Sequence, residues 1–521
     1  METVRFAYPV GTCLVVAYTV FLALFSHVGF PQAMSVDTHM PFLCDKPVGE
    51  DGYYMLETAW NLAAGKGMVG SDGQTVTGTQ PLSTLLFAIL AKLVQICGGG
   101  KWTFVRAIIA FGGLNLIVFA FLIGKISRAI SRKHHDLVFA LGSGLALFNF
   151  WLFRSFTYGL ETGIYVTLLA ALLLFTLRRL PSAKTRDIVG IGLLAGLCGW
   201  ARIDFGVVFF IFLIMALRWR LMSLKQVFLS GLVALLLISP WFVWVYAESG
   251  TMMPSSGSAQ AELINMTDAG KRLAGMTTTL IDHLTPWSYS VSAAPVVALE
   301  LASLVILAVF IHAKRVNIIN ILSDIGYSSV YIAWCLAVTA LIPVYVMFFW
   351  AVHFYGRYTA PLHCAVLPFL AVVLAALLAK MKRKHIVCQV FFLVFVLSFA
   401  LFAGRTLHMG VIGNAHSVSA GFIQRYFDQS VHIGAFQSGV IGYFNDNAVN
   451  LDGKVNSQAL RALQTNTLER YIDEAHIGVI VDWPYIIHRY LSEQWLADWQ
   501  LCARQPANES ICLTIAGTEK K

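Results

Sequence analysis

The sequence predicts an all-α membrane protein that crosses the bilayer about eleven times and ends in a small α/β domain. The chain of 521 residues is 57% hydrophobic and only 12% charged, with a mean hydropathy of +0.69, far from the composition of soluble proteins. Apolar runs of about 17 to 24 residues recur up to residue 403, and each is long enough for a membrane-spanning helix. Residues 404–521 are polar, with short apolar pieces typical of strands.

The predicted spans follow the apolar runs in order. Residues 8–30 come first and are preceded by Arg5; we expect an uncleaved anchor with its N-terminus inside, although a signal peptide shares this pattern. The run 187–219 is too long for one crossing and holds Arg202 and Asp204 near its centre, so we expect two short spans that meet at the outer face. The other spans are predicted at 104–126, 137–153, 160–177, 226–246, 295–313, 328–350, 361–379 and 386–403.

The run 81–97 decides the topology. It begins at Pro81 and carries Lys92 near its middle, so it can span the bilayer or lie flat on its surface. If it lies on the surface, five short basic loops all face the cytoplasm, as the positive-inside rule requires. The first loop, residues 31–103, and the C-terminal domain then lie on the outer side. The basic residues of the five loops are Lys125, Arg128, Arg132 and Lys133; Arg178, Arg179, Lys184 and Arg186; Arg218, Arg220 and Lys225; Lys314 and Arg315; and Lys380, Lys382, Arg383 and Lys384.

Charge, cysteines and motifs exclude several functions. The net charge of +9 would suggest nucleic-acid binding in a soluble protein, but the basic residues lie in short membrane loops, so we expect no nucleic-acid partner. The nine cysteines show no zinc-site spacing, and disulfides are allowed only between Cys502 and Cys512 or between Cys44 and Cys97. Because no Walker A, GxGxxG, HExxH or GxSxG motif occurs, a sugar donor carried on lipid phosphate fits better than a nucleotide sugar.

The polar tail is predicted to form a small outer domain. Residues 439–444 and 477–481 are short apolar pieces that we expect to be strands, and a helical pattern lies between them at 457–475. We therefore divide the chain into a transmembrane catalytic domain, residues 1–403, and a C-terminal extracytoplasmic α/β domain, residues 404–521.

The expected centre of the chemistry is an acidic pair just beyond the first span. Glu50 or Asp51 can deprotonate a hydroxyl or attack an electrophilic carbon, whereas a solvated acidic pair or a site for a divalent cation is the alternative. Tyr53 and Tyr54 can stack on a sugar or simply anchor the segment at the interface. Helical spacing from Asp51 through Tyr54 to Asn61 places these groups on one face, and the glycines at 65 and 67 are expected to end that helix.

Basic side chains on the same outer side are candidates for phosphate binding. Arg202 and Arg357 lie at predicted helix ends, where a guanidinium group can bind phosphate with two hydrogen bonds, and His353 precedes Arg357 by four residues. The alternative for Arg202 is a structural ion pair with Asp204. Glu161 begins a predicted span, where an acid favoured by the helix dipole is the alternative to a role in the site.

With these residues considered, the chain resembles the integral-membrane GT-C glycosyltransferases that use polyprenyl-phosphate sugars. The resemblance covers roughly residues 45–365 and rests on seven short motifs in the family's order. They are Glu50-Asp51-Gly52-Tyr53-Tyr54, Asn61 to Gly67, Gly78-Thr79-Gln80-Pro81-Leu82, Gly159-Leu160-Glu161-Thr162, Arg202-x-Asp204, Pro240-Trp241 with Pro254, and Gly356-Arg357-Tyr358. Within the family the chain is most similar to bacterial and mycobacterial arabinofuranosyltransferases and related mannosyltransferases. Ile203 stands where their Arg-Pro-Asp/Glu turn has proline.

The resemblance implies a GT-C fold in the bacterial inner membrane, with the active site on the periplasmic side. It implies that Asp51 is the catalytic carboxylate, with Glu50 as helper or metal ligand, and that Arg202, Arg357 and His353 bind the donor phosphate. The remaining predicted cavity residues are Tyr53, Tyr54, Asn61, Gln80, Glu161, Asp204 and Tyr358. No resident cofactor is expected beyond an optional divalent cation at Glu50 and Asp51.

The implied reaction transfers arabinofuranose or a mannose-like sugar from polyprenyl phosphate to a surface glycan, or to a surface protein such as pilin. Inversion with Asp51 as base and retention with a carboxylate nucleophile are both open. An O-antigen ligase or polymerase would be expected to keep its key residues in a large late loop, whereas the carboxylates here lie in the first. A lipid-linked sugar transporter would be expected to place charges at mid-bilayer, whereas here they gather at one mouth.

Overall fold

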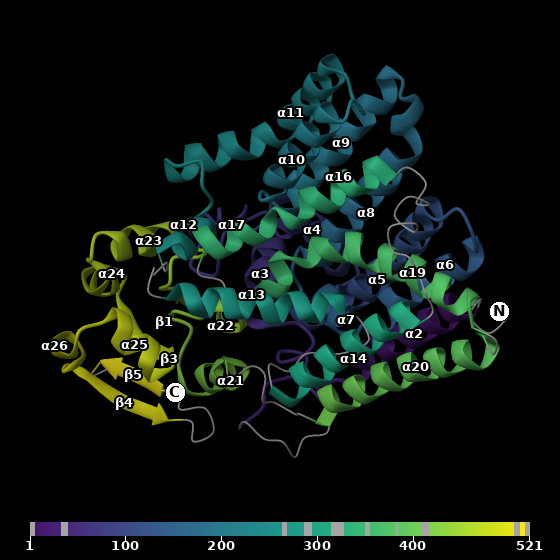
Figure 1. The fold of residues 1–521 in the computed structure, drawn as a ribbon. Coiled ribbons are helices and arrows are strands. Elements are labelled where there is room, and N and C mark those ends of the chain that lie inside the picture. Colours follow the sequence, from purple (N-terminus) through teal and green to yellow (C-terminus); the bar gives the residue numbers. More distant parts are fainter. Residues whose placement is uncertain are drawn as a thin grey trace.

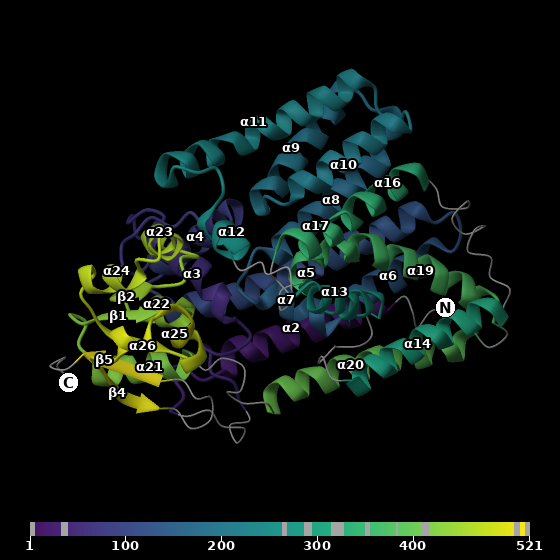
Figure 2. The same ribbon diagram turned by 60° about the vertical axis from the view of Figure 1, so that its left-hand side comes forward.

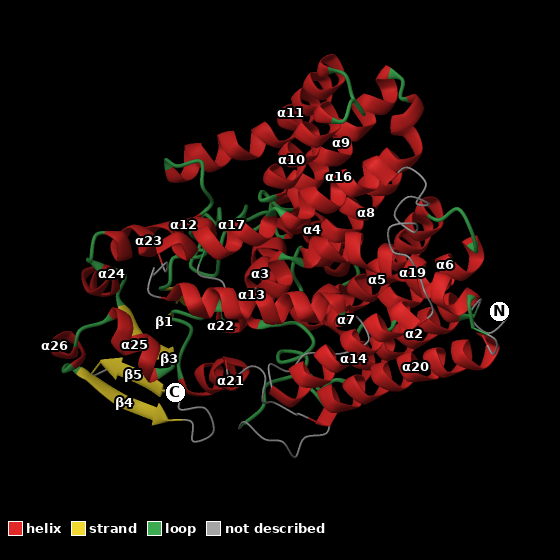
Figure 3. Cartoon of the chain, in the orientation of Figure 1, coloured by secondary structure: helices red, strands yellow, loops and turns green. Residues whose placement is uncertain are grey.

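The computed structural model describes residues 6–32, 40–262, 268–285, 294–313, 328–349, 355–381, 384–408, 416–504 and 511–515. The chain forms a helical bundle with a small mixed domain at one end (Figure 1), and the N-terminus lies at the end of the bundle away from that domain (Figure 2). Figure 3 shows that the strands of the described residues belong to this domain, which the C-terminal part of the chain forms.

The helices that precede the C-terminal domain form at the predicted apolar runs and also in the loops between those runs. They are α2 (Ala7–Phe25), α3 (Glu50–Ala63), α4 (Pro81–Ile96), α5 (Lys101–Ile130), α6 (His135–Leu147), α7 (Phe150–Thr157), α8 (Thr162–Arg179), α9 (Thr185–Ala201), α10 (Phe205–Arg218), α11 (Leu224–Ser249), α12 (Ser255–Glu262), α13 (Ala269–Leu284), α14 (Ala294–Ala313), α16 (Ser328–Thr339), α17 (Leu341–Phe348), α18 (Tyr355–Tyr358), α19 (His363–Ala379) and α20 (Lys384–His408). Short 3₁₀ helices follow α8 (η1, Leu180–Ser182) and precede α19 (η4, Ala360–Leu362).

The predicted number of eleven spans is not confirmed. Among the described residues, six helical segments are long and apolar enough to cross a membrane, or seven if the bent pair α6 and α7 is one span. Helices also form at the other predicted spans, but α9 and α10 are only 17 and 14 residues long. The six segments are Ala7–Phe25, Lys101–Ile130, Thr162–Ser182, Leu224–Ser249, Ser329–Phe348 and Ala360–Ala379.

The predicted span 137–153 is not one straight helix. It breaks between α6 and α7, which are bent by 58°. The cause is local, because the side chain of Asn149 accepts a hydrogen bond from the backbone N–H of Leu152 and so starts a new helix. The run 187–219 divides as predicted, at the Arg202–Asp204 turn between α9 and α10.

Two helices of the first loop lie where the sequence predicts them. Glu50 and Asp51 occupy the first turn of α3, where the helix dipole favours negative charge. Gly65 and Gly67, with φ of +82° and +91°, follow the end of α3 and turn the chain away. Pro81 begins α4, because a proline at the first helical position loses no hydrogen bond.

The C-terminal domain is a five-stranded mixed sheet with order β2-β1-β3-β5-β4. Strands β1 and β2 and strands β1 and β3 are parallel, whereas β5 pairs antiparallel with β3 and β4. A disulfide joins Cys502 to Cys512, while the thiol of Cys44 donates to the Gly29 carbonyl and does not pair with Cys97. The elements are α21 (His416–Tyr426), β1 (His432–Ala435), α22 (Gly439–Phe444), β2 (Ala448–Asn450), α23 (Ser457–Gln464), α24 (Leu468–Glu474), β3 (Ile477–Asp482), α25 (Pro484–Tyr490), α26 (Glu493–Leu496), β4 (Trp499–Arg504) and β5 (Ile511–Ile515).

One strand prediction for this domain is wrong and one is confirmed. Residues 477–481 lie in β3, and the predicted helical region forms α23 and α24, but residues 439–444 form the helix α22. A contact across the molecule accounts for the difference. The carboxylate of Glu50 accepts the N–H groups of Gly439 and Val440 at the start of α22, which a strand at this position would not present together.

The hydrophobic core runs without a break from the bundle into the C-terminal domain. Buried residues of α3, such as Tyr53, and of α22, such as Tyr443, belong to the same cluster as the buried residues of α5 and α8. The rings of these two tyrosines lie 5.2 Å apart. The helix α3 is therefore held between the bundle and the C-terminal domain, and this placement forms the site described below.

Candidate active site

Adjacent carboxylates at the start of α3 point to different surroundings. Asp51 faces a cavity, and its Oδ2 accepts a hydrogen bond of 3.1 Å from Nη1 of Arg357. Glu50 instead accepts the backbone N–H groups of Gly439 and Val440 in the C-terminal domain. The acidic pair therefore does not act as one unit, and only Asp51 is presented to the cavity.

The cavity has a volume of about 310 Å³ and lies where the first loop, the bundle and the C-terminal domain meet. Its described lining residues come from eight short segments that lie far apart in the sequence. Its walls are formed by Asp51, Tyr54, Met55, Gly78, Thr79, Gln80, Leu160, Glu161, Arg202, Ile203, Asp204, Val207, Met253, Pro254, Ser256, Gly257, Val344, Tyr345, Phe349, Arg357, Tyr358, Lys454 and Val455. Seven of the predicted site residues besides Asp51 lie here: Tyr54, Gln80, Glu161, Arg202, Asp204, Arg357 and Tyr358.

Arg202 forms a buried ionic cluster in one wall. Its guanidinium lies 2.5 Å from Oε1 of Glu161 and 3.0 Å from Oδ2 of Asp204, and it also donates to the hydroxyl of Tyr345 at 3.0 Å. Arg202 and Glu161 are each only 5% exposed. Because protein acceptors surround the guanidinium, this geometry favours the structural alternative for Arg202, with a net negative cluster next to the cavity.

Arg357 is placed differently. It comes from the short helix α18, pairs with Asp51, and donates from Nη2 to the hydroxyl of Tyr358 at 3.2 Å. The ring centre of Tyr358 lies 4.8 Å from the guanidinium carbon of Arg202 and 5.0 Å from that of Arg357. The same ring stacks on Tyr345. This aromatic pair fixes both arginines while leaving Arg357 at the cavity wall.

A further cation in the cavity comes from the C-terminal domain. Lys454 lies in the turn after β2, and its Nζ is 2.8 Å from Oδ2 of Asp452. Burial lowers the pKa of Lys454, but the carboxylates of Asp452 and Asp51 outweigh it and raise that pKa above the usual range. The turn is tied to the bundle because Ser255 donates its hydroxyl to the Lys454 carbonyl at 2.8 Å.

Solved structures share this architecture. ArnT from Cupriavidus metallidurans in the apo state matches with a TM-score of 0.55 at 12% identity, covering 97% of this chain and 98% of that chain. The same protein bound to undecaprenyl phosphate matches with a TM-score of 0.53, at the same identity and coverage. The Archaeoglobus fulgidus oligosaccharyltransferase in complex with Zn and sulfate matches with a TM-score of 0.51 at 10% identity, covering 96% of this chain and 72% of that chain.

The chain has the GT-C fold. No protein-family model and no curated protein matches the sequence. The likeness is one of fold, and the GT-C assignment predicted from the short motifs is confirmed at that level.

Three of the predicted site residues that the structure describes do not line the cavity. Tyr53 is buried and donates its hydroxyl to the Leu43 carbonyl at 2.7 Å. The amide of Asn61 donates to the carbonyls of Val69 and Gly70, so it shapes the first loop. Glu50 lies in the domain interface, and His353 lies outside the described residues.

Glu50 does not offer a cation site in this arrangement. Both of its oxygens accept backbone N–H groups, whose partial positive charge repels a cation. In the described ranges, no group of three or more His, Cys, Asp or Glu side chains gathers as a metal ion would require. The optional divalent cation at Glu50 and Asp51 therefore finds no fitting donor set.

Sequence reasoning missed Lys454 and the interface around Tyr54. The Tyr54 hydroxyl accepts the N–H of Ser438 at 2.9 Å, so this tyrosine both lines the cavity and holds the C-terminal domain. The one available signal for Lys454 is the Asp452-Gly453 turn after an apolar piece, where Gly453 has φ of +77°. Nothing in the sequence places that turn opposite Asp51.

The interface between the bundle and the C-terminal domain buries the carboxyl groups of Glu50 and Glu57. Burial raises the pKa of Glu50 to about 7 and that of Glu57 to about 8. A group with a raised pKa binds its proton more tightly in the packed interface than in water. The stability of the interface is therefore fully present below about pH 4 to 5 and falls as the pH rises through 7 to 8.

We expect the thermal midpoint of the purified protein in detergent to fall as the pH is raised from 5 to 8, near the pKa values above. Glu50→Gln, which stays neutral, should remove the Glu50 share of this fall. That share corresponds to a loss of unfolding free energy on the order of 2–3 kcal/mol. The measurement is a series of fluorescence melting curves at fixed ionic strength. An unchanged pH dependence in Glu50→Gln would show that Glu50 does not titrate in the interface.

Proposed function

We propose that the protein is a glycosyltransferase that moves a sugar from a polyprenyl-phosphate donor to a hydroxyl group of an extracytoplasmic acceptor. The observation that carries this proposal is the Asp51–Arg357 pair on the cavity wall, which places a carboxylate beside a cation in a GT-C fold. Support comes from the similar ArnT structure, which binds undecaprenyl phosphate.

The charged residues around the cavity have different partners, and we assign them different roles. Glu161 and Asp204 are tied to Arg202, so Asp51 is the cavity-lining carboxylate outside that cluster. Lys454 and Arg357 bring positive charge to the same wall region as Asp51. We assign Lys454 and Arg357 to the donor phosphate, and we assign Arg202 to holding the wall, where its donors already meet protein acceptors.

The reaction is a single displacement in this assignment. The acceptor oxygen attacks the anomeric carbon, the bond from that carbon to the phosphate oxygen breaks, and the acceptor proton passes to the free oxygen of Asp51. Polyprenyl phosphate leaves with the bonding electrons, and the cations at 357 and 454 stabilise its added charge. A good leaving group needs no general acid, so one carboxylate is enough. Because the reaction is a single displacement, the configuration at the anomeric carbon inverts.

The finer assignments follow from the motifs. We propose arabinofuranose or a mannose-like sugar as the donor group, and a surface glycan or a surface protein such as pilin as the acceptor class. We also propose that the bundle lies in a bacterial inner membrane with Asp51 and residues 404–521 on the periplasmic side. The GT-C catalytic domain is then residues 1–403.

The function is tested by reconstituting the full chain in lipid vesicles with synthetic polyprenyl-phosphate arabinofuranose and, separately, polyprenyl-phosphate mannose. We expect one donor to release polyprenyl phosphate and to label an added glycan acceptor. Movement of the intact lipid-linked sugar across the bilayer without cleavage would identify a transporter instead. Transfer only from diphosphate-linked chains would identify an enzyme of the ligase class.

A further inference from the structure

A second cavity lies in the C-terminal domain, next to the first. It has a volume of about 390 Å³, within the range of small-molecule sites. It is enclosed by α12, the turn after β2, the helices α23 and α24, and the end of α25. Its lining residues are Ala259, Asp452, Leu460, Leu463, Gln464, Asn466, Leu468, Glu469, Arg489 and Tyr490.

The two cavities share one thin wall. On the turn after β2, Lys454 lines the first cavity and Asp452 the second, and their side chains form an ion pair of 2.8 Å. On α12, Gly257 lines the first cavity and Ala259 the second. The Ser255–Lys454 hydrogen bond ties these two elements together. The two cavities are therefore neighbours on either side of the turn after β2 and of α12.

The lining chemistry indicates the ligand. Two carboxylates accept hydrogen bonds, the guanidinium of Arg489 donates them, and the carboxamides of Gln464 and Asn466 can do both. Leucines and Tyr490 supply apolar surface between these groups. The lining has no excess positive charge for a phosphate, because Lys454 pairs with Asp452 and Glu469 balances Arg489. Mixed donors and acceptors beside apolar surface match the hydroxyl groups and ring faces of a neutral sugar.

Two of the lining residues are held in place by contacts within the domain. Oε1 of Glu469 accepts the N–H of Ser492 at 2.7 Å, and the ring of Tyr490 stacks on Phe436 with centroids 4.9 Å apart. Asn466 sits at φ of +55° in the turn between α23 and α24 and lines the cavity. A fixed set of groups binds a ligand at a smaller entropic cost than a mobile set.

We infer that the second cavity binds the acceptor, and that this acceptor is a neutral glycan whose inner residues sit among Asp452, Asn466, Glu469 and Arg489 while its terminal hydroxyl reaches Asp51. The inference rests on the proposed function and adds the acceptor class to it. It makes the C-terminal domain the acceptor-binding part of the enzyme, and it separates acceptor binding from donor binding across the Asp452–Lys454 pair.

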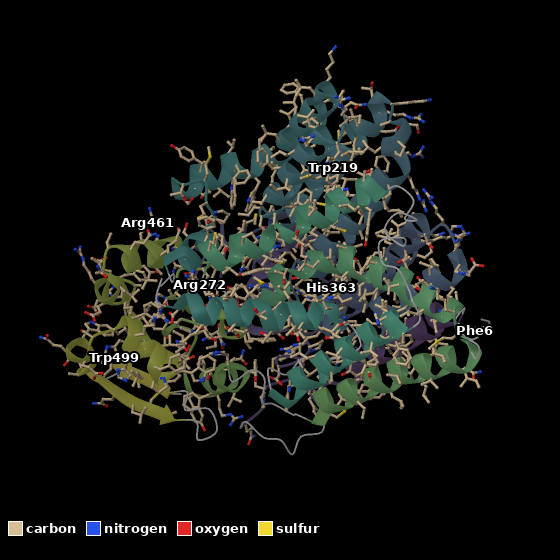
Figure 4. The ribbon with its side chains drawn as sticks, viewed as in Figure 1. Phe6, Trp219, Arg272, His363, Arg461 and Trp499 are labelled. Carbon is tan, nitrogen blue, oxygen red and sulfur yellow. A yellow bond between two sulfur atoms is a disulfide. The ribbon has the colours of Figure 1, made fainter. Side chains whose placement is uncertain are left out.

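The test measures binding of short arabinofuranosyl and mannosyl oligosaccharides to the full-length protein by saturation-transfer NMR and calorimetry. We expect saturable binding of one series, weakened about tenfold or more in Arg489→Ala, which loses charge-assisted hydrogen bonds. The matched control is Arg461→Ala. Arg461 is an exposed arginine on α23, labelled in Figure 4. It lines neither cavity, so its replacement should leave binding unchanged.

A filled-cavity variant, Leu463→Trp, should weaken glycan binding without removing a charge, and its melting curve shows whether it folds. Absence of binding by either sugar series, binding that ignores both variants, or binding of a pilin peptide at Arg489 instead would overturn the inference. Transfer that continues without dependence on Arg489 would also overturn it and would leave the proposed function standing. Glycan binding without any sugar transfer would leave the glycan site standing and overturn the proposed function.

Discussion

Asp51→Asn is expected to lower the rate of sugar transfer by about 10²- to 10⁴-fold, the range for loss of a general base. Asparagine has nearly the same size, and its carbonyl oxygen can still accept the 3.1 Å hydrogen bond from Arg357. The asparagine amide cannot take up the acceptor proton at neutral pH. The measurement is the initial rate of polyprenyl-phosphate release in vesicles, with donor binding followed separately.

The matched control for this prediction is Asp446→Asn. Asp446 also pairs with a cation, Lys101, at 2.7 Å, but its side chain is 66% exposed and lies away from the cavity. Loss of an exposed pair of this kind costs little, so transfer should continue at the wild-type rate. Full activity in Asp51→Asn with normal donor binding would remove Asp51 from the mechanism and leave the GT-C fold untouched.

The anomeric configuration of the product provides a second check on Asp51. Inversion is expected if the carboxylate is a base in a single displacement. Retention would instead require a covalent intermediate on a carboxylate, which mass spectrometry of the protein with a slow donor would detect. Inversion would identify Asp51 as a base, and retention would identify a carboxylate as the nucleophile.

The parts of the fold that the sequence predicts are those set by local chemistry. Apolar runs fix where helices form, and Pro81, Gly65 and the Arg202–Asp204 turn mark helix boundaries that the structure contains. The bend after α6 escaped prediction because Asn149 lies inside an uninterrupted apolar run, where its capping role has no distinctive neighbour. The same run gave no signal that α6 and α7 would separate.

The candidate site shows a different limit. Glu50 and Asp51 are adjacent, so a helix turns their side chains about 100° apart and only one can face a given wall. Which one faces the cavity depends on where α22 packs, and the apolar residues 439–444 suggested a strand in place of that helix. Lys454 is separated from Asp51 by some four hundred residues, and only the docking of the C-terminal domain brings them to one cavity.

That docking is tested where the backbones of α22 and α3 approach closely. A Cβ atom at residue 439 would lie 2.2 Å from the backbone oxygen of Glu50, so Gly439→Ala forces α22 away from α3. The hydrogen bonds to Glu50 and Tyr54 cannot then keep their lengths, and Lys454 is displaced from the cavity. We expect a lower thermal midpoint, faster amide exchange in α22, and loss of most transfer activity.

Two companion variants separate docking from phosphate binding. Gly270→Ala, on α13, adds the same methyl group where no atom lies within 4 Å, and it should leave both stability and transfer unchanged. Lys454→Met breaks the ion pair with Asp452 and should lower the thermal midpoint without speeding amide exchange in α22. It should also weaken donor binding about 10- to 100-fold, as loss of a charge-assisted hydrogen bond predicts. If Gly439→Ala lowers stability while donor binding stays intact, the C-terminal domain supports the fold without taking part in the donor site. If Gly439→Ala and Lys454→Met both weaken donor binding, then α3 has two roles. It positions the carboxylate of Asp51 directly, and through Glu50 and Tyr54 it positions the Lys454 cation.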